Sequence, residues 1–353
     1  MPVLNQGARM KRPAITAAAA MLLTATTALA QTPLQVPARS VPVPTDVSPQ
    51  MQAIIGRPIN PNWRDIPQTP EQWAARQAAT GAAVDQLPAM RARLHVKVEP
   101  AIMGGVKVFV VTPERIAPRN RGRLLIQIHG GCYVVNPGQA ATTEAILMAG
   151  IGHYKVISID YRMPPAAYFP AALDDVISVW QAVLKTHPAR RMGVLGSSAG
   201  GALTLEMVLR ARQLGLPLPA AISPGTPMAD LTGAGDSFNT NAMVDNVLIS
   251  REGFCDPAAK FYANGHDLAD PLLSPINGDM HGFPPAILTT GTRDLLLSNT
   301  VRTHRKLRQA GVEAQLQVYE GQSHAQYGRD DQAPETREAF GEIAAFFDKH
   351  LAK

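Results

Sequence analysis

The chain has 353 residues, of which 46% are hydrophobic and 17% charged, and this composition excludes fibrous and intrinsically disordered proteins. One catalytic domain is expected, because α/β enzymes often fold around a single sheet even when they are this long. The formal charge of +5 includes three cations among the first 30 residues and leaves +2 for the rest of the chain, which has no long run of Lys and Arg. No nucleic-acid partner is therefore expected, since such binding needs a clustered basic face.

The first 30 residues have the three parts of a secretory signal peptide. Three basic residues at positions 9–12 precede an apolar stretch over residues 14–29, and the segment ends in Ala-Leu-Ala. The apolar stretch is short for a membrane span and is interrupted by threonines. We therefore expect cleavage after Ala30, export to the periplasm or the cell exterior, and no stable membrane insertion. An uncleaved anchoring helix is the alternative.

Two segments of different character follow the signal peptide. Residues 31–50 carry five prolines, which predicts an extended arm. Residues 51–93 contain Trp63, Trp73 and an alanine-rich stretch, and this pattern predicts short helices with apolar faces that need a surface to pack on. We expect these helices to form part of a cap over an active-site mouth.

The rest of the chain alternates between strand-like and helical segments. This rhythm predicts an α/β fold with a mostly parallel sheet flanked by helices, in a catalytic domain over residues 51–353. The rhythm breaks at residues 224–284, where Gly, Asp, Asn and Pro are frequent and one helix is expected near residues 256–262, so this segment predicts a second part of the cap. The strand-like runs are residues 106–111, 124–128, 156–159, 192–195, 286–290 and 315–319.

Residues 196–201 have the sequence GSSAGG and lie between a strand-like run and a helical pattern. A G-x-S-x-G sequence in that setting forms a sharp turn that presents the serine hydroxyl, and its glycines avoid collisions with neighbouring backbone. We therefore expect Ser198 to be a nucleophile. The N–H of Ala199 begins the following helix and is expected to face the same point.

Residues 129–133, His-Gly-Gly-Cys-Tyr, directly follow the apolar run at 124–128. Acyl transfer places negative charge on a carbonyl oxygen, and N–H donors that are fixed in advance stabilise this charge. Gly130 and Gly131 are expected to supply such donors together with Ala199, forming an oxyanion hole. Cys132 and Tyr133 are expected to contact the substrate.

A serine nucleophile needs a base, and the chain has nine histidines. In α/β-hydrolases the serine, the acid and the histidine occur in that order, each after a later strand. Asp294 follows the run at 286–290 and His324 follows the run at 315–319. We therefore predict a triad of Ser198, Asp294 and His324. His129 precedes the oxyanion glycines, and a role in shaping that loop is expected for it.

Together, the HGGCY and GSSAGG segments and the segment 160–175 between them resemble the hormone-sensitive-lipase-like family of α/β-hydrolases, which includes bacterial carboxylesterases. The resemblance runs from about residue 96 to the C-terminus. The family usually has HGGG and GDSAGG, so Cys132 and Ser197 are departures. Segments 291–297 and 319–324 look most like the branch that contains monoterpene lactone hydrolases. For segment 160–175 we expect a structural role, in which its charges brace loops near the sheet.

The resemblance implies a serine carboxylesterase or lactonase that acts on short to medium acyl esters or lactones. An acyltransferase on the same site and a non-catalytic small-molecule-binding protein on the same scaffold are the alternatives. No metal or organic cofactor is expected, because the sequence has no HExxH, CxxC or dinucleotide glycine pattern. The two cysteines, Cys132 and Cys255, are expected to be free thiols, since a bridge would tether the substrate loop.

Overall fold

The computed structural model describes residue 2 and residues 33–352. The chain divides into two units, Met1–Ser40 and Val41–Lys353. The predicted signal peptide, apart from residue 2, lies outside the described residues. Residues 33–48 have no helix or strand, and helix α1 (Pro49–Ile55) begins within the last two residues of the predicted arm.

The second unit is built on an eight-stranded sheet in the order β1-β2-β4-β3-β5-β6-β7-β8. The pairs β1–β2 and β2–β4 are antiparallel, and all other neighbours are parallel. The expected fold class, an α/β-hydrolase fold with a mostly parallel sheet, is therefore confirmed. The strands are β1 (Val96–Met103), β2 (Val106–Pro113), β3 (Leu124–Ile128), β4 (Val156–Ile159), β5 (Met192–Ser197), β6 (Ala221–Gly225), β7 (Ala286–Gly291) and β8 (Ala314–Tyr319).

Two of these strands, β1 and β6, were not expected from the sequence. Strand β1 lies at the sheet edge, is mostly exposed or half-buried and contains Pro100, so its apolar signal is weak. Strand β6 ends in Ser223, Pro224 and Gly225, which break the apolar pattern, although all five of its residues are buried. The cap segment, expected from about residue 224, therefore overlaps the last two residues of β6, which continues to Gly225.

Helices cover both faces of the sheet and explain why the central strands are apolar throughout. In β3, Ile126 and Ile128 face one hydrophobic cluster, which includes residues of α5, α6 and α9, whereas Leu125 faces another, which includes residues of α4 and α10. These helices are α4 (Thr143–Gly152), α5 (Ala171–Leu184), α6 (Ala199–Gln213), α9 (Leu297–Gln309) and α10 (Pro334–His350).

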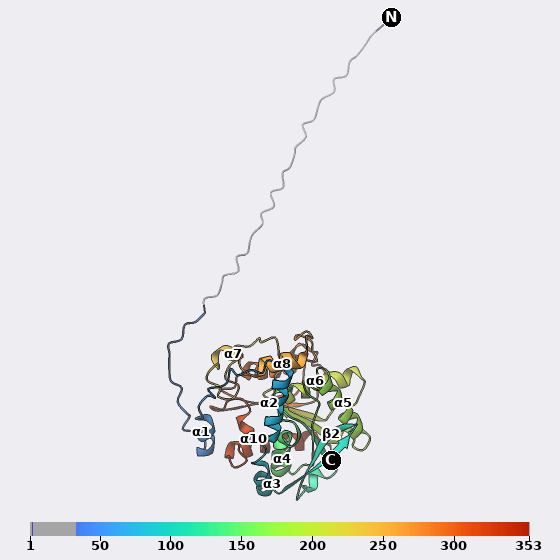
Figure 1. Cartoon of the computed structure of the whole chain (residues 1–353). Helices are drawn as coiled ribbons and strands as arrows, with labels where there is room; N and C mark the ends of the chain where they lie inside the picture. The colour runs from blue at the N-terminus through green and yellow to red at the C-terminus, as the bar shows by residue number, and fades with distance from the viewer. Residues whose placement is uncertain (1, 3–32, 353) are drawn as a thin grey trace. The chain divides into compact units, whose positions relative to one another are not determined.

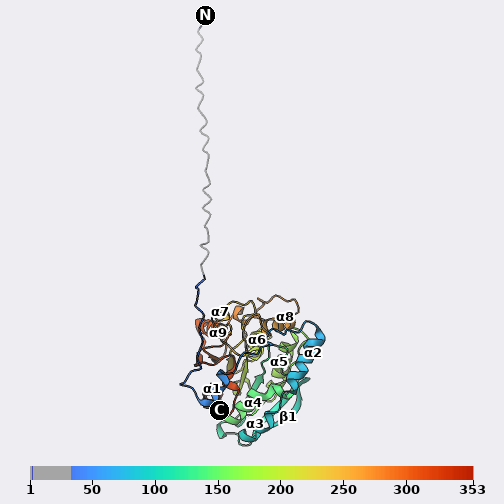
Figure 2. The ribbon, with the colours of Figure 1, turned by 60° about the vertical axis from the view of Figure 1, so that its left-hand side comes forward.

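Short helices are found in both segments that were expected to form a cap. The first segment contains part of α1, together with α2 (Pro70–Ala82) and α3 (Leu87–Leu94). The second segment contains α7 (Ser237–Thr240) and α8 (Cys255–Ala263). Helix α8 matches the helix expected near residues 256–262. The two segments touch, because the ring of Trp73 in α2 lies 5.1 Å from that of Phe261 and 5.4 Å from that of Phe254. Figures 1 and 2 show α7 and α8 at one end of this unit and α3 near the other.

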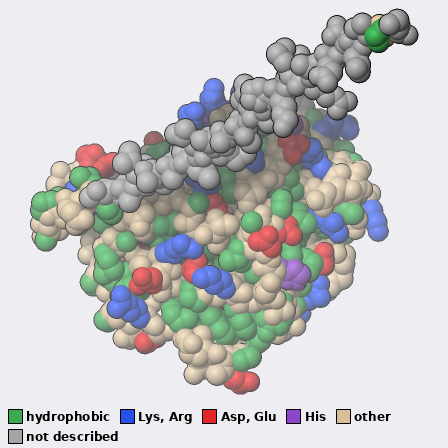
Figure 3. All heavy atoms as spheres, turned by 90° about the horizontal axis from the view of Figure 1, so that it is seen from above, with side chains coloured by type: hydrophobic (Ala, Val, Ile, Leu, Met, Phe, Trp, Pro, Cys, Tyr) green, Lys and Arg blue, Asp and Glu red, His purple; other side chains and the backbone are tan. Residues whose placement is uncertain are grey.

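The end of the unit that carries α7 and α8 has a surface of mixed charge. Where this face is visible in Figure 3, basic and acidic side chains are interspersed and do not gather by sign. None of the helices in residues 33–352 is both long enough and apolar enough to span a bilayer.

Candidate functional site

Ser198 lies in the turn between β5 and α6 and has a backbone conformation that residues other than glycine seldom adopt, with φ 61° and ψ −124°. Neighbouring backbone holds this conformation. The N–H of Ser198 donates to the carbonyl of Gly225 at 2.9 Å, and its own carbonyl accepts from Ala202 N at 3.0 Å and Met228 N at 3.1 Å. The turn is therefore fixed by β6 on one side and by α6 on the other.

The loop after β3 packs directly against this turn, and the glycines make the close approach possible. A Cβ atom on Gly200 would collide with the carbonyls of Ile128 and His129. A Cβ atom on Gly130 would lie 2.7 Å from the carbonyl oxygen of Ser197. The two glycine-rich segments recognised in the sequence thus meet in space, as the hypothesis of an oxyanion hole requires.

His129 shapes the oxyanion loop. Its ring stacks on Tyr161 with the ring centroids 4.1 Å apart, and its Nδ1 lies 2.7 Å from the carbonyl oxygen of Gly130. Burial lowers the pKa of His129 to about 4, so the ring is neutral near pH 7 and its Nδ1–H donates to that carbonyl. Because a peptide unit is planar, fixing the carbonyl of Gly130 also fixes the direction of the Gly131 N–H.

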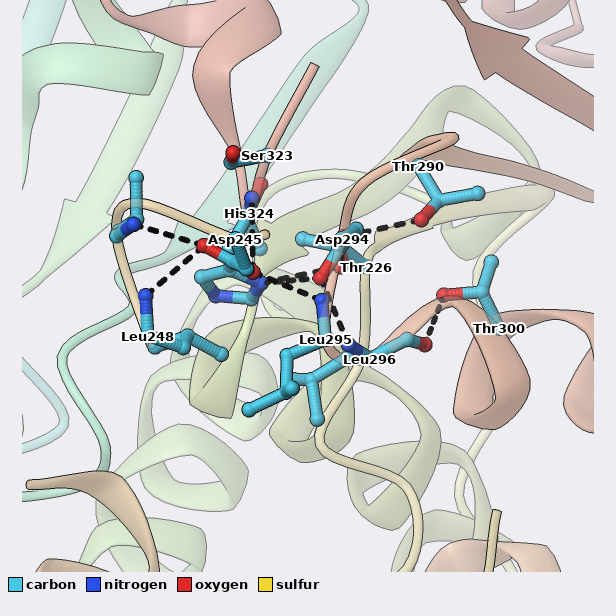
Figure 4. Close-up of polar contacts among 12 residues, drawn as sticks. Thr226, Asp245, Leu248, Thr290, Asp294, Leu295, Leu296, Thr300, Ser323 and His324 are labelled. Atoms are coloured by element: carbon cyan, nitrogen blue, oxygen red, sulfur yellow. Dashed lines mark hydrogen bonds and ion pairs between the residues drawn. The ribbon is translucent and has the colours of Figure 1, made fainter. Parts of the chain in front are cut away.

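Asp294 and His324 are hydrogen-bonded to each other at the ends of β7 and β8. His324 Nδ1 lies 3.0 Å from Asp294 Oδ1, and both side chains are buried (Figure 4). Oδ1 of Asp294 also accepts from Leu296 N at 2.8 Å, and its Oδ2 accepts from the hydroxyls of Thr290, at 2.9 Å, and Thr226. With the Nδ1–H donated to Asp294, the Nε2 of a neutral His324 has a free lone pair and can accept a proton.

Ser198 and His324 both line one cavity of about 540 Å³. This volume lies within the range of small-molecule sites. The same cavity is lined by Gly130, Gly131 and Cys132, so five of the eight predicted site residues share it. Asp294 lies behind His324, and Ala199 begins α6 next to Ser198. The remaining walls include Gln86, Glu144, Val247, Leu248, Phe254 and Arg329.

Tyr133, expected to contact substrate, does not line this cavity within the described part of the chain. Its side chain is fully buried, its ring stacks on Tyr262 with the centroids 4.5 Å apart, and its hydroxyl donates to Glu206 Oε1 at 3.0 Å. Tyr133 therefore supports the oxyanion loop from behind. The expected substrate contact is not found, because the backbone at residues 131–133 has positive φ and turns this ring into the core.

Cys132 and Cys255 form a disulfide, so the expectation of two free thiols is wrong. Their Cα atoms lie 5.2 Å apart although the residues are separated by 123 positions in the sequence. The insert, which is the segment 226–285 between β6 and β7, brings the start of α8 over the oxyanion loop, and both cysteines line the cavity. The bridge thus joins the loop after β3 to the cap.

Several residues that shape the site carried no recognisable signal in the sequence. Thr226 follows β6 and Thr290 lies near the end of β7, and both donate to Asp294, but no sequence motif marks either residue. Segment 160–175 has the structural role that was expected for it: the backbone N–H and the guanidinium of Arg162 both donate to the carboxylate of Asp175. Across residues 33–352, no group of three or more Asp, Glu, His or Cys side chains is placed to hold a metal ion.

Comparisons with known proteins agree with this fold. A family model described as alpha/beta hydrolase fold matches residues 125–328. An acetyl-hydrolase of Streptomyces hygroscopicus is 30% identical over 237 residues, which cover 67% of this chain and 79% of that protein. The crystal structure of esterase E25 matches with a TM-score of 0.87 and 44% identity, covering 91% of this chain and 99% of that one. An esterase from the bacterial hormone-sensitive lipase family matches with a TM-score of 0.69 and 25% identity, covering 81% and 100%.

Proposed function

Because the chain belongs to the α/β-hydrolase fold family, among its hormone-sensitive-lipase-like esterases, we propose that it hydrolyses carboxylic esters through an acyl-enzyme on Ser198. In this proposal His324 is the general base and Asp294 is its carboxylate partner. One observation carries the assignment: His324 is hydrogen-bonded to buried Asp294 through Nδ1 at 3.0 Å and shares the wall of one cavity with Ser198.

The reaction begins when Ser198 Oγ bonds to the ester carbonyl carbon and its proton passes to His324 Nε2. The carbonyl oxygen becomes negatively charged and accepts hydrogen bonds from the N–H groups of Gly130, Gly131 and Ala199. The carbon–oxygen bond to the alcohol then breaks as His324 returns the proton to the leaving oxygen. Water then attacks the carbonyl carbon of the acyl-enzyme, with His324 again transferring the proton, and the free acid leaves Ser198.

Asp294 serves this cycle by orienting the imidazole and offsetting its positive charge. The carboxylate accepts from four groups, namely Leu296 N, the hydroxyls of Thr226 and Thr290, and His324 Nδ1. Hydrogen bonds of this kind hold a carboxylate in one orientation. Asp294 thus keeps the Nδ1–H tautomer, which leaves Nε2 available to Ser198.

The cavity wall guides the choice of substrate class. Val247, Leu248 and Phe254 supply apolar surface from the insert, and the volume of about 540 Å³ suits short to medium acyl esters. The relatives include an acetyl-hydrolase, which is consistent with a short acyl group. Lactones are cyclic esters and require the same steps, so they belong to the proposed range. From the predicted signal peptide we also propose that the protein is exported to the periplasm or the cell exterior.

The test uses protein that begins at residue 31 and p-nitrophenyl esters with acyl chains of increasing length, together with a panel of lactones. Wild type should be active, and Ser198→Ala should lose activity by about 10⁴-fold or more, since loss of a triad nucleophile has an effect of that order. Ser197→Ala is the matched control and should keep activity within about tenfold. An arylsulfonyl fluoride should label Ser198 in a peptide digest. Equal turnover in wild type and Ser198→Ala would refute the assignment.

A further inference from the structure

A second buried carboxylate, Asp245, lies between the two loops that carry Asp294 and His324 (Figure 4). Asp245 lies in the insert, between α7 and α8, and its side chain is fully buried. The carboxylate accepts from four backbone N–H groups in three separate segments. Oδ1 accepts from Val247 N at 2.7 Å and Leu248 N at 3.0 Å; Oδ2 accepts from Leu295 N at 2.8 Å and His324 N at 3.3 Å.

The two carboxylate oxygens of Asp245 accept hydrogen bonds from different segments. Oδ1 closes a local turn in the insert, as aspartate side chains commonly do. Oδ2 binds the N–H of the residue after Asp294 and the N–H of His324 itself. One oxygen atom therefore connects the loop after β7 to the loop after β8, and hydrogen bonds to a charged acceptor are stronger than neutral ones.

The next residue, Asn246, reinforces the same connection. Its backbone N–H donates to Ser323 Oγ at 3.2 Å, and its Oδ1 accepts from Gln326 Nε2 at 2.8 Å. Its Nδ2 donates to the backbone carbonyls at the end of α1. Residues 245–246 of the insert thus contact the loop that bears His324 on both sides of the histidine.

We propose that Asp245 is a positioning residue for the ester hydrolysis. Its carboxylate holds the loops after β7 and β8 at the spacing that lets Asp294 and His324 share the Nδ1 proton. This inference rests on the proposed function, because it concerns the groups that activate Ser198. Asp245 acts through the backbone of His324 and of Leu295 and does not touch the substrate.

Charge adds a second contribution from the same residue. The ionisable groups that interact with Asp245 include Asp294, His324 and Arg329. Burial and the negative charge of Asp294 raise the pKa of the Asp245 carboxyl above its ordinary value, while the imidazole of His324 opposes this effect. When His324 accepts the proton of Ser198, a second negative charge behind Asp294 favours the imidazolium. Loss of that charge should make the imidazolium form of His324 less favourable during the reaction.

The experiment compares two substitutions that separate the local turn from the connection between loops. Asp245→Asn has only one acceptor oxygen and can serve only one of the two pairs of N–H groups. Asp245→Ser keeps a hydroxyl acceptor for the local turn but is too short to reach Leu295 and His324. Both should lower kcat about 10- to 100-fold with little change in KM, since small misplacement of catalytic groups has effects of this size. The acid limb of the kcat/KM profile should move to lower pH.

Asp230→Asn is the matched control. Asp230 is also a buried carboxylate of the insert, and it closes a similar turn, accepting from Thr232 N at 3.0 Å. Its other oxygen pairs with Arg302 at 2.6 Å and does not reach the loops of the site. The Asp230→Asn variant should be destabilised but should keep the wild-type kcat and pH profile. An identical response of the two positions would show a merely structural role for Asp245.

The outcomes distinguish this inference from the proposed function. If Ser198→Ala is as active as wild type, the proposed function fails. If Ser198→Ala is inactive while Asp245→Asn and Asp245→Ser keep wild-type kcat and pH profile, only the inference about Asp245 fails. Hydrogen exchange of wild type tests the bonds without a substitution: the amides of Leu295 and His324 should be protected to a similar degree. An unprotected His324 amide would overturn the inference even if neither variant folds.

Discussion

Replacement of Cys255 by alanine should show whether the bridge to Cys132 stabilises both the fold and the oxyanion loop. The bridge closes a loop between residues 123 positions apart. The chain-entropy model gives about 5 kcal/mol for a loop of this length, and removal of native disulfides typically costs about 2–5 kcal/mol. We therefore expect Cys255→Ala to lower the free energy of unfolding by about 2–5 kcal/mol.

The same substitution should also change catalysis, because Cys132 lies in the loop that carries Gly130 and Gly131 and because both cysteines line the cavity. A loop without its covalent link to α8 should hold the oxyanion donors less firmly. We expect kcat to fall about tenfold, since removal of a whole oxyanion donor costs about 100-fold or more. The preference among acyl chain lengths should broaden, because the link is part of the cavity wall.

The assay is urea unfolding followed by tryptophan fluorescence, with and without a reducing agent. Wild type should lose stability when it is reduced, whereas Cys255→Ala should not respond. Cys132→Ala should behave like Cys255→Ala, and the double variant should add nothing further, because both single changes remove the same bond. Two thiols that titrate in unfolded wild type without reduction, or equal urea midpoints for wild type and Cys255→Ala, would refute the reasoning.

Three further predictions concern buried polar groups of the site. Burial lowers the pKa of His129 to about 4, so the unfolded chain binds a proton on this ring more tightly than the folded chain does. The free energy of unfolding of wild type should therefore rise by about 3 kcal/mol between pH 4 and pH 6.5. Urea unfolding of His129→Asn should show a smaller rise. Burial raises the pKa of Glu206, so Glu206→Gln should keep the free energy of unfolding near pH 7 within about 1 kcal/mol of wild type. Glu206→Leu should lose about 1–3 kcal/mol, because the hydroxyl of Tyr133 loses its acceptor. A larger loss for Gln than for Leu in urea unfolding would contradict this prediction. Thr226→Val removes a donor to Asp294 Oδ2 and should lower kcat about tenfold with KM unchanged in steady-state assays, and an unchanged kcat would argue against a role for this hydroxyl.

Local sequence predicted those parts of the site that depend on backbone geometry. Ser198 was recognisable because a sharp turn between strand and helix requires glycines at fixed offsets, and the positive φ of the serine follows from that turn. Asp294 and His324 were recognisable from the order of the strands that precede them. Their hydrogen bond confirms that the ends of β7 and β8 meet, as neighbouring parallel strands must.

The parts that escaped prediction depend on contacts between distant segments. The disulfide forms because the insert folds back over a loop that lies 123 residues earlier, and pairing of two cysteines cannot be read from their spacing. Tyr133 was expected at the substrate, but the turn in its backbone places the ring beside Tyr262 of α8. Strand β6 was not predicted, because Pro224 and Gly225 interrupt its short apolar run.

These long-range contacts share one partner, the insert between β6 and β7. Through Cys255 it reaches the oxyanion loop, through Asp245 it reaches the loops of the proposed acid and base, and through Val247 and Leu248 it forms cavity wall. A segment that only covered a preformed site would affect which substrates enter. Because this segment is bonded to the oxyanion loop and to the loops that carry Asp294 and His324, exchanging it for the insert of a relative should change kcat as well as acyl preference. A chimera that changed acyl preference alone, at wild-type kcat, would show that the insert acts only as a cover.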